Sequence, residues 1–304
     1  MRAIVFDRYG GLEVLHPAEV PDPVAGPGQV LVRIAAAAVN PADYKWRSGM
    51  FAEMIPLPMP HIVGYDVAGT VLAVGSGVTG FAAGDRVAAM LNPITKGGYA
   101  QMVAIDAATA ARIPDGLDFA RAAAVPCAAL TGAQVIEEVI RPKTGQTLLI
   151  TGATGAVGVA GLLAALRLGA RVVAAVRSKY AAQAHALGAT ATLALGEEDW
   201  SGAPFDHVFD TVGGEAVARL CRHLAPSGLI CTAATTPIDP TGLAAQPQFV
   251  AVRPDGPRLQ VLLEDVASGR LPITIARRLP LAQAAEAQRL VEAGGLNGKV
   301  ILEP

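Results

Sequence analysis

The chain has 304 residues, a length that exceeds one typical domain and suits two. Hydrophobic residues make up 52% of it and charged residues only 16%, a balance that excludes intrinsic disorder. The net charge of −2 gives no electrostatic basis for binding nucleic acid, and no apolar run approaches the roughly 18 residues of a membrane span.

Cysteine usage and the first residues bear on the compartment. Cys127, Cys221 and Cys231 form no CxxC pair, so neither a disulfide framework nor a zinc knuckle is indicated. We interpret them as small buried hydrophobic residues. The first ten residues resemble a short strand and lack the segments of a signal peptide. We therefore expect a cytoplasmic enzyme.

The chain up to about residue 120 contains short β-rich runs separated by glycine and proline turns. Many short strands with such turns predict a strongly bent, mostly antiparallel sheet or partial barrel. Strands are expected at residues 1–6, 29–36, 66–74, 85–91 and 100–105.

From about residue 117 the pattern changes to alternating strands and helices, which predicts a parallel, doubly wound sheet. Strands are expected at residues 147–151, 171–176, 190–195, 207–210 and 229–233. Helices are expected at residues 118–124, 131–140, 156–168, 179–187 and 215–224. The segment 235–248, which contains three prolines, is irregular and has no predicted element.

The last part of the chain regains β character. Helical patterns at residues 258–268 and 281–293 precede a final strand at 299–302. We predict that this segment returns to complete the first domain. The fold class is then α/β, with a Rossmann domain at 123–256 inserted in a bent β-rich domain of residues 1–122 and 257–304.

A glycine-rich turn between a buried strand and an apolar helix is the most informative local signal. One glycine of such a loop lets the backbone approach a pyrophosphate, and another lets the helix pack close to the sheet. The GxGxxG pattern is here AxGxxG, preceded by a glycine, and its place between strand and helix supports dinucleotide binding. The loop consists of Gly152, Ala153, Thr154, Gly155, Ala156, Val157 and Gly158.

Cofactor choice is inferred from the end of the next strand. In an NAD site an acidic residue about 20 positions beyond the loop binds the ribose hydroxyls. No acidic residue occurs between Gly152 and Gly196, and the strand is followed by Arg177, Ser178 and Lys179. The two cations would attract a 2′-phosphate, and Ser178 could donate to it or cap the following helix. We therefore predict NADPH.

Further motifs, in order along the chain, resemble those of the medium-chain dehydrogenase/reductase superfamily, and within it the zinc-free quinone oxidoreductase branch. The resemblance covers essentially the whole chain. It implies a bent, GroES-like catalytic domain and a Rossmann domain with the active site between them. The motifs are Asn40-Pro-Ala-Asp43, Arg47-Ser-Gly49, Gly64-Tyr-Asp66, Gly84-Asp-Arg-Val87, Gly97-Gly-Tyr99, Ala122 to Thr131, the glycine loop, Asp210-Thr-Val-Gly-Gly214 and Gly298-Lys-Val-Ile-Leu302.

The resemblance also implies that no metal is bound. Alcohol dehydrogenases of this superfamily have Cys where Asn40 stands and His where Tyr65 stands, and amide and phenol groups are poor zinc ligands. The cysteines of a structural zinc lobe are missing from residues 91–112. Hydride transfer to an electron-poor quinone or conjugated enone needs no Lewis acid, so positioning in a dry site would supply most of the catalysis.

By resemblance, Asn40 and Thr131 would lie near the nicotinamide and ribose, and Thr211 and Ala233 along the cofactor. Tyr44, Lys45 and Tyr65 are candidate hydrogen-bond donors to the substrate oxygen. The catalytic candidates are Asn40, Tyr44 and Tyr65. Some bacterial quinone reductases carry a 2′-phosphate-binding Tyr where this chain has Leu195.

We predict an NADPH:quinone or enone oxidoreductase that acts on a small electrophilic molecule, not on nucleic acid or at a membrane. A 2-alkenal or enoyl-thioester reductase and a non-catalytic NADPH-binding protein remain alternatives. The resemblance implies a homodimer, for which the apolar strand edge at residues 229–234 is suited.

Overall fold

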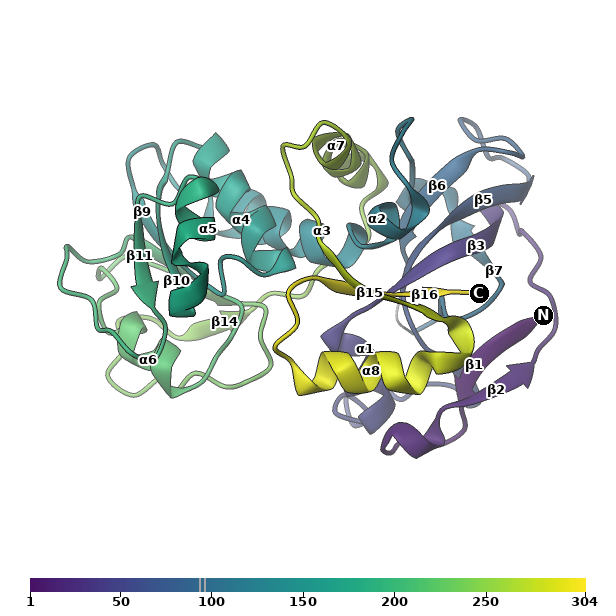
Figure 1. The fold of residues 1–304 in the computed structure, drawn as a ribbon, viewed down its shortest axis with the longest axis horizontal. Helices are drawn as coiled ribbons and strands as arrows, with labels where there is room; N and C mark the ends of the chain where they lie inside the picture. The colour runs from purple at the N-terminus through teal and green to yellow at the C-terminus, as the bar shows by residue number, and fades with distance from the viewer. Residues whose placement is uncertain (93, 96) are drawn as a thin grey trace. The chain divides into compact units, whose positions relative to one another are not determined.

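The computed structural model describes residues 1–92, 94–95 and 97–304. The chain divides into two compact units, coloured in Figure 1 from purple through green to yellow along the chain. Unit 1 comprises Met1–Cys127 and Arg253–Pro304, and unit 2 comprises Ala128–Val252. Helix α3 (Pro126–Gln134) carries the chain across the first division.

Unit 2 is built on a parallel sheet whose strand order is β11-β10-β9-β12-β13-β14. This is the order of a doubly wound Rossmann fold, in which the strand order reverses beside the first strand. The predicted Rossmann architecture is therefore confirmed. The strands are β9 (Thr147–Thr151), β10 (Arg171–Val176), β11 (Ala191–Ala194), β12 (His207–Asp210), β13 (Ile230–Thr232) and β14 (Pro247–Phe249).

Helices cover both faces of this sheet because successive strand residues point to opposite sides. Leu148 and Ile150 of β9 belong to the apolar cluster beneath α4 (Ala156–Arg167) and α5 (Ala181–Ala186). Leu149 belongs to the apolar cluster on the opposite face of the sheet, which includes residues of α6 (Glu215–Cys221). Figure 1 shows α4 and α5 together and α6 apart from them. A short 3-10 helix, η4 (Ser178–Tyr180), precedes α5, and a π-helical turn, η3 (Val135–Ile140), follows α3.

The long strand β3 (Gln29–Val39) organises unit 1. It pairs with β5, β7 and β16, always antiparallel, and its register against β5 shifts twice, between Leu31 and Val32 and between Ile34 and Ala36. Such irregularities bend a strand, as the bent β-rich fold requires. The seven-stranded sheet contains β3, β5 (Asp66–Val74), β6 (Arg86–Met90), β7 (Met102–Asp106), β8 (Ala110–Arg112), β15 (Ile275–Pro280) and β16 (Lys299–Glu303).

A smaller antiparallel sheet and several helices complete unit 1. The sheet has the order β2-β1-β4, and helices α1 and α8 pack against each other, as Figure 1 also shows. The remaining elements are β1 (Arg2–Phe6), β2 (His16–Glu19), β4 (His61–Ile62), α1 (Pro41–Ser48), α2 (Phe119–Ala123), α7 (Gly256–Ala267), α8 (Ala284–Ala293), η1 (Leu12–Val14), η2 (Ala107–Thr109) and η5 (Leu281–Gln283).

The strand β16 brings the C-terminal segment back to the first domain. Val300 lies opposite Val39, and Leu302 opposite Ala37. The last strand of the chain therefore belongs to the same sheet as β3.

Two features of unit 2 differ from the sequence-based expectations. The segment 235–248, for which no element is predicted, leads into β14. This strand pairs with β13 from Ile230↔Pro247 to Thr232↔Phe249. The strand predicted at 229–233 is therefore not the sheet edge, which is formed by β14. In addition, the helix predicted at 131–140 begins at Pro126 and changes to a π-helix at Val135.

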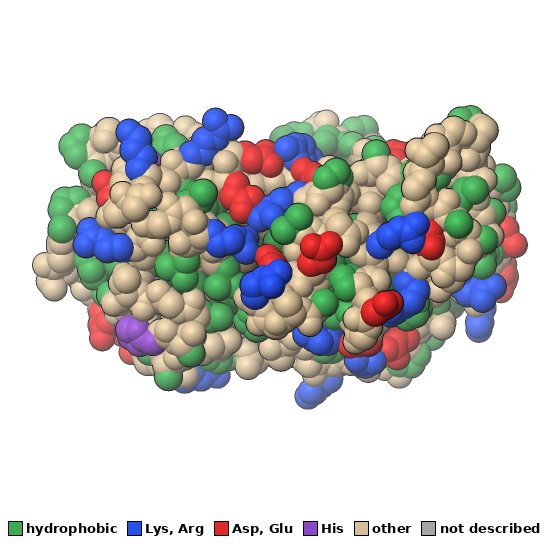
Figure 2. Space-filling model, turned by 90° about the horizontal axis from the view of Figure 1, so that it is seen from above, with side chains coloured by type: hydrophobic (Ala, Val, Ile, Leu, Met, Phe, Trp, Pro, Cys, Tyr) green, Lys and Arg blue, Asp and Glu red, His purple; other side chains and the backbone are tan. Residues whose placement is uncertain are grey.

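No helix among the described residues is long and apolar enough to cross a bilayer. On the face drawn in Figure 2, Lys and Arg side chains are interspersed with Asp and Glu side chains. That face therefore carries no large patch of a single charge.

Candidate cofactor and catalytic site

The glycine loop leaves β9 at Thr151 and enters α4 at Ala156. Gly152 has φ 61°, a left-handed conformation that glycine adopts without steric cost. A Cβ at Gly158 would lie 2.2 Å from the carbonyl oxygen of Gly152, so only glycine permits this approach of helix to loop. A Cβ at Gly155 would lie 3.2 Å from the same oxygen, and Gly155 is exposed. Gly158 is therefore packed against the loop, whereas Gly155 faces solvent.

The start of α4 suits a diphosphate. Gly155 is the N-cap residue, it provides no side-chain cap, and the first turn contains no acidic residue. The first amides of a helix have no partner within it and carry partial positive charge. Thr154, Ala156 and Val157 are partly exposed, whereas Ala153 is buried. The loop therefore offers amide donors at an accessible helix start, which fits the diphosphate of a dinucleotide.

A buried carboxylate, Asp210 at the end of β12, ties the neighbouring strand ends together. Its Oδ1 accepts from the Thr151 hydroxyl and from the amides of Val212 and Gly213, both at 2.9 Å. Its Oδ2 accepts from the Thr232 hydroxyl at 2.6 Å. Asp210 therefore fixes the carboxyl ends of β9, β12 and β13, where doubly wound sheets bind their ligands.

This bracing holds two of the predicted cofactor residues at the loop. The hydroxyl of Thr211 donates to the carbonyl oxygen of Thr151 at 2.8 Å, and a Cβ at Gly152 would lie 2.4 Å from that hydroxyl. Ala233 follows β13, and its amide donates to the carbonyl oxygen of Asp210 at 2.9 Å. The structure thus gathers Thr211 and Ala233 at the strand ends from which the glycine loop also departs.

The predicted phosphate-binding residues lie at the end of β10, next to β9 in the sheet. Arg177, Ser178 and Lys179 are all exposed. The Arg177 guanidinium and the Lys179 ammonium lie over the Tyr180 ring, at 5.1 Å and 5.0 Å from its centroid. The Ser178 hydroxyl does not cap the following helix but donates to a carboxylate oxygen of Glu197 at 2.8 Å.

In unit 1, Asn40 is the centre of a buried polar network. It is 3% exposed and caps α1, where its amide donates to Asp43 at 2.8 Å. Its Nδ2 donates to Asp66 at 2.9 Å, and its Oδ1 accepts from the Lys299 ammonium. These two partners define the orientation of the Asn40 side-chain amide, because the ammonium can only donate a hydrogen bond and the carboxylate here accepts one.

Burial raises the pKa of both carboxyl groups in this network. The pKa of Asp43 rises to about 7, although hydrogen bonds from the Asn40 amide and the Tyr99 hydroxyl oppose the shift. The pKa of Asp66 rises to about 6, and the Lys299 ammonium opposes that shift. Burial therefore favours the protonated form of both carboxyl groups more than water does.

The tyrosine and lysine candidates have different surroundings. Burial raises the pKa of Tyr65 well above its ordinary value, and its hydroxyl accepts a weak contact from the Cys127 thiol at 3.9 Å. Tyr44 is half-buried on α1, and burial raises its pKa as well. Burial lowers the pKa of Lys45, whose ammonium lies 5.8 Å from the centroid of the Tyr44 ring. Burial therefore makes the proton of Lys45 easier to release, and it makes the protons of Tyr44 and Tyr65 harder to release.

Thr131 lies on α3 and is 6% exposed. A Cβ at the adjacent Gly132 would lie 2.5 Å from the carbonyl oxygen of Val157, so α3 packs closely on the start of α4. This places Thr131 in a helix that borders the glycine loop. Asn40 and Tyr65 belong to unit 1, and Thr131 belongs to unit 2.

Several residues of these hydrogen-bond networks were not among the predicted site residues, although they stand in the motifs already named. Asp43, Asp66, Tyr99 and Lys299 complete the network around Asn40, and Asp210 braces the strand ends. For Asp66, Lys299 and Asp210 the available signal was their type, since charged residues within apolar strands are rarely buried without partners.

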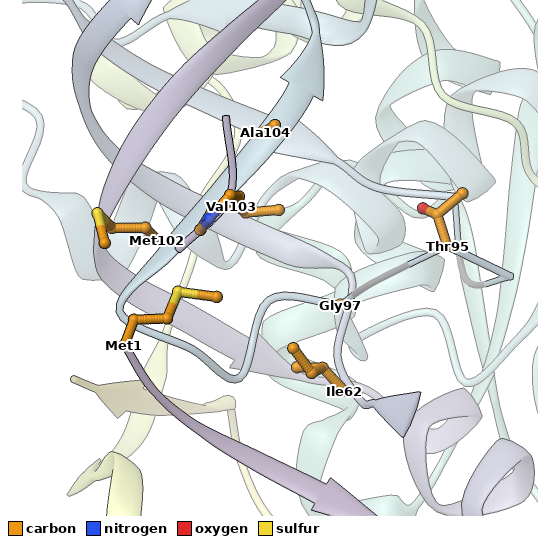
Figure 3. A pocket seen from close by; sticks show the side chains of 8 residues that line it. Met1, Ile62, Thr95, Gly97, Met102, Val103 and Ala104 are labelled. Atoms are coloured by element: carbon orange, nitrogen blue, oxygen red, sulfur yellow. The ribbon is translucent and has the colours of Figure 1, made fainter. Parts of the chain in front are cut away.

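Among the described residues, no group of three or more His, Cys, Asp or Glu side chains is arranged to hold a metal ion. A hollow of about 200 Å³ in unit 1, shown in Figure 3, is mostly apolar and is lined by no predicted site residue. Met1, Ile62, Met102 and Val103 are among the residues that surround it.

Comparison with known proteins gives two family matches. Residues 26–115 match the alcohol dehydrogenase GroES-like domain, and residues 168–302 match the zinc-binding dehydrogenase domain. The first lies wholly in unit 1, and the second runs from unit 2 through the return to unit 1.

Curated relatives match the chain from end to end. The 2-methylene-furan-3-one reductase of Solanum lycopersicum is 33% identical over all of this chain and 79% of its own length. A quinone oxidoreductase of Pseudomonas aeruginosa is 31% identical over all of this chain and 99% of its own length.

Solved structures agree with both matches. An NAD-dependent alcohol dehydrogenase superposes with a TM-score of 0.89 at 32% identity, over the whole of both chains. A quinone oxidoreductase from Coxiella burnetii also reaches 0.89, at 29% identity over all of this chain and 99% of its own. The chain therefore belongs to the medium-chain dehydrogenase/reductase superfamily, in the branch that contains the quinone oxidoreductases.

Proposed function

We propose that this oxidoreductase uses NADPH, without zinc, to transfer hydride to a quinone or a conjugated enone. The observation that carries the cofactor choice is the cationic end of β10, where Arg177 and Lys179 stand beside the strand that leads into the glycine loop. A mycobacterial relative solved with NADPH, with a TM-score of 0.84 at 28% identity, supports the same choice.

Each part of the proposed cofactor site has a separate task. The amides at the start of α4 bind the diphosphate, and Arg177 and Lys179 bind the 2′-phosphate. When bound, the nicotinamide supplies the hydride. Asn40, Tyr44 and Tyr65 are proposed to contact the nicotinamide or the substrate. Lys45 is the proposed proton source, because burial already lowers the pKa of its ammonium.

Zinc independence is supported by the donor atoms present. Asn40 is an amide whose oxygen is already bound by the Lys299 ammonium, and Tyr65 is a phenol whose pKa lies well above its ordinary value. Zinc sites use thiolate, imidazole and carboxylate ligands, and a ligand must be deprotonated to bind. We expect full activity after exhaustive dialysis against a chelator, and a requirement for added Zn²⁺ would contradict the proposal.

A 2-alkenal or enoyl-thioester reductase is the second candidate. It is supported by an Arabidopsis thaliana relative named as an NADPH-dependent alkenal/one oxidoreductase, 31% identical over all of this chain and 80% of its own length. A polyketide synthase component of Streptomyces venezuelae is 32% identical over 96% of this chain. Comparing kcat/KM for 1,4-naphthoquinone, a 2-alkenal and a crotonyl thioester separates the candidates. NADPH binding without turnover of any of them would favour the non-catalytic alternative.

The cofactor proposal is tested by replacing Arg177 with Ala. A charge-assisted hydrogen bond contributes about 1.5–3 kcal/mol, so the affinity for NADPH should fall about 10- to 100-fold and that for NADH should change little. Arg171→Ala is the matched control, because Arg171 begins the same strand at its opposite end. Unchanged discrimination between NADPH and NADH in Arg177→Ala would refute the proposal.

The homodimer implied by the resemblance remains a prediction. If subunits associate by extending the parallel sheet, β14 is the strand available at that edge. Sedimentation equilibrium would measure the oligomeric state directly.

A further inference from the structure

A carboxylate stands at the proposed 2′-phosphate site although the sequence around β10 contains none. Glu197 follows β11, the strand that pairs with β10 in parallel, so the ends of the two strands lie side by side. Val176 at the end of β10 is opposite Ala194 at the end of β11. Glu197 reaches across this edge and accepts a hydrogen bond from Ser178 at 2.8 Å.

This hydrogen bond conflicts with the binding of a phosphate. A hydroxyl has one proton to donate, so Ser178 cannot donate to Glu197 and to a 2′-phosphate at the same time. The carboxylate would also repel a phosphate dianion that Arg177 and Lys179 attract. A ribose with a free 2′-hydroxyl is different, because that hydroxyl can donate to a carboxylate, as it does in NAD sites.

We propose that Glu197 is a specificity-determining residue that weakens the preference of this chain for NADPH over NADH. With NADPH bound, Glu197 must release the Ser178 hydroxyl and tolerate a neighbouring anion. With NADH bound, Glu197 stays as an acceptor for the ribose. The inference rests on the proposed function, since it concerns the same cofactor site.

The chain offers a matched control in the adjacent residue. Glu198 carries the same charge and is also exposed, but its carboxylate accepts from the backbone amide of Ala194 at 3.0 Å instead of from Ser178. Glu197→Gln and Glu198→Gln therefore change the net charge equally, and only the first removes the charge beside Ser178.

The test measures dissociation constants for NADPH and NADH by isothermal titration calorimetry, without any substrate. In Glu197→Gln the affinity for NADPH should rise about tenfold, because a neutral acceptor competes about half as strongly for Ser178 as a charged one. The affinity for NADH should stay the same or fall. In Glu198→Gln the ratio of the two affinities should change by less than about twofold.

Four outcomes are decisive. A ratio in Glu197→Gln equal to that of the unaltered protein overturns the inference, and so does an equal change in both variants, which would indicate a general charge effect. If Arg177→Ala alters discrimination and Glu197→Gln does not, the inference fails and the proposed function stands. If the unaltered protein binds neither nucleotide, both fail.

Adding Ser178→Ala to Glu197→Gln tests whether the gain in NADPH affinity depends on the Ser178 hydroxyl. Without the hydroxyl, only the repulsion between carboxylate and phosphate remains, so the gain from Glu197→Gln should shrink about threefold. A gain of undiminished size would show that Ser178 has no part in the discrimination.

Discussion

The polar network around Asn40 and the glycine loop before α4 use opposite means to define a functional site. The network consists of buried polar side chains, in which Asp43, Asp66 and Lys299 are each hydrogen-bonded to Asn40. The loop consists of glycine and small residues, and it offers backbone amides where side chains would be in the way. The network depends on the pairing of charged and polar side chains, and the loop depends on the small volume of its side chains.

This difference determines how each region should respond to substitution. In the network, removing one partner leaves another buried without compensation, and an unpaired buried charge is among the most destabilising defects. In the loop, a Cβ at Gly158 would collide with backbone, which can shift only at a cost in stability. Charge changes should therefore affect the network most, and changes of volume should affect the loop most.

The largest effect is expected from Lys299→Met. The Lys299 ammonium opposes the raised pKa of Asp66 and also that of Asp43, so its loss leaves two buried carboxyl groups without this compensation. The free energy of unfolding should fall by about 3–5 kcal/mol at pH 8. The loss should be smaller at pH 5, because the carboxyl groups can then take up protons. Urea denaturation at both pH values measures it.

Arg278→Met is the control for Lys299→Met. Arg278 lies on the neighbouring strand β15, opposite Ile301, and its ion pairs with Asp118 and Glu303 are at the surface. Surface pairs contribute less than about 1 kcal/mol, so this variant should be nearly as stable as the original chain. If the two variants lost equal stability, the Lys299 network would be no more than a surface ion pair.

The second effect in size is expected from Gly158→Ala. Its Cβ would lie 2.2 Å from the carbonyl oxygen of Gly152, so α4 or the loop must shift. Overpacking of this kind costs about 1–3 kcal/mol of stability. The amides that bind the diphosphate should move with it, and the affinity for NADPH should fall at least about tenfold. Thermal unfolding and calorimetric titration measure the two effects.

Gly155→Ala is the matched control within the same loop. Its Cβ would meet the Gly152 carbonyl oxygen at 3.2 Å and the site is exposed, so small adjustments can relieve the contact. We expect a loss of stability below about 1 kcal/mol. If this variant were as unstable as Gly158→Ala, the close packing of helix on loop would not be what makes Gly158 necessary.

The same contrast explains which parts were predictable from the sequence. The loop and the strands around it have local signals, because β9, the turn and α4 are contiguous and their periods are regular. The parallel, doubly wound sheet followed from the alternation of strands and helices. By contrast, the helix α1 was missed, although Asn40 caps it and Pro41 begins it. Short strands such as β2, β4 and β8 are too brief to show a period.

The partners of the buried network could not be found in this way. Lys299 and Asn40 are 259 residues apart and meet because β16 pairs with β3. No local pattern encodes such a pairing. The proximity of Glu197 to Ser178 could not be predicted for a related reason, since Glu197 arrives from the next strand, one residue beyond the acid-free stretch that ends at Gly196.

The smallest effect, and the one that separates charge from space most cleanly, is expected from Asp43→Asn. One carboxylate oxygen of Asp43 accepts both the Asn40 amide and the Tyr99 hydroxyl, and a side-chain amide oxygen can accept the same two bonds. The substitution therefore keeps the shape and removes the titration. Burial raises the pKa of Asp43 to about 7 in the folded state, from an ordinary value of 3.8.

The sign of the pH dependence follows from that shift. A raised pKa means that the folded state holds more protons than the unfolded state above pH 3.8, so its stabilising contribution is lost as the pH rises through 7. Between pH 5 and pH 8, Asp43→Asn should therefore gain stability relative to the original chain, on the order of 1–2 kcal/mol. In Asp85→Asn, where Arg112 holds the pKa of the carboxyl below its usual range, the difference from the original chain should stay constant over the same interval. A constant difference for Asp43→Asn as well would mean that its carboxyl group ionises as freely as one in water, and the network would then be defined by its shape alone.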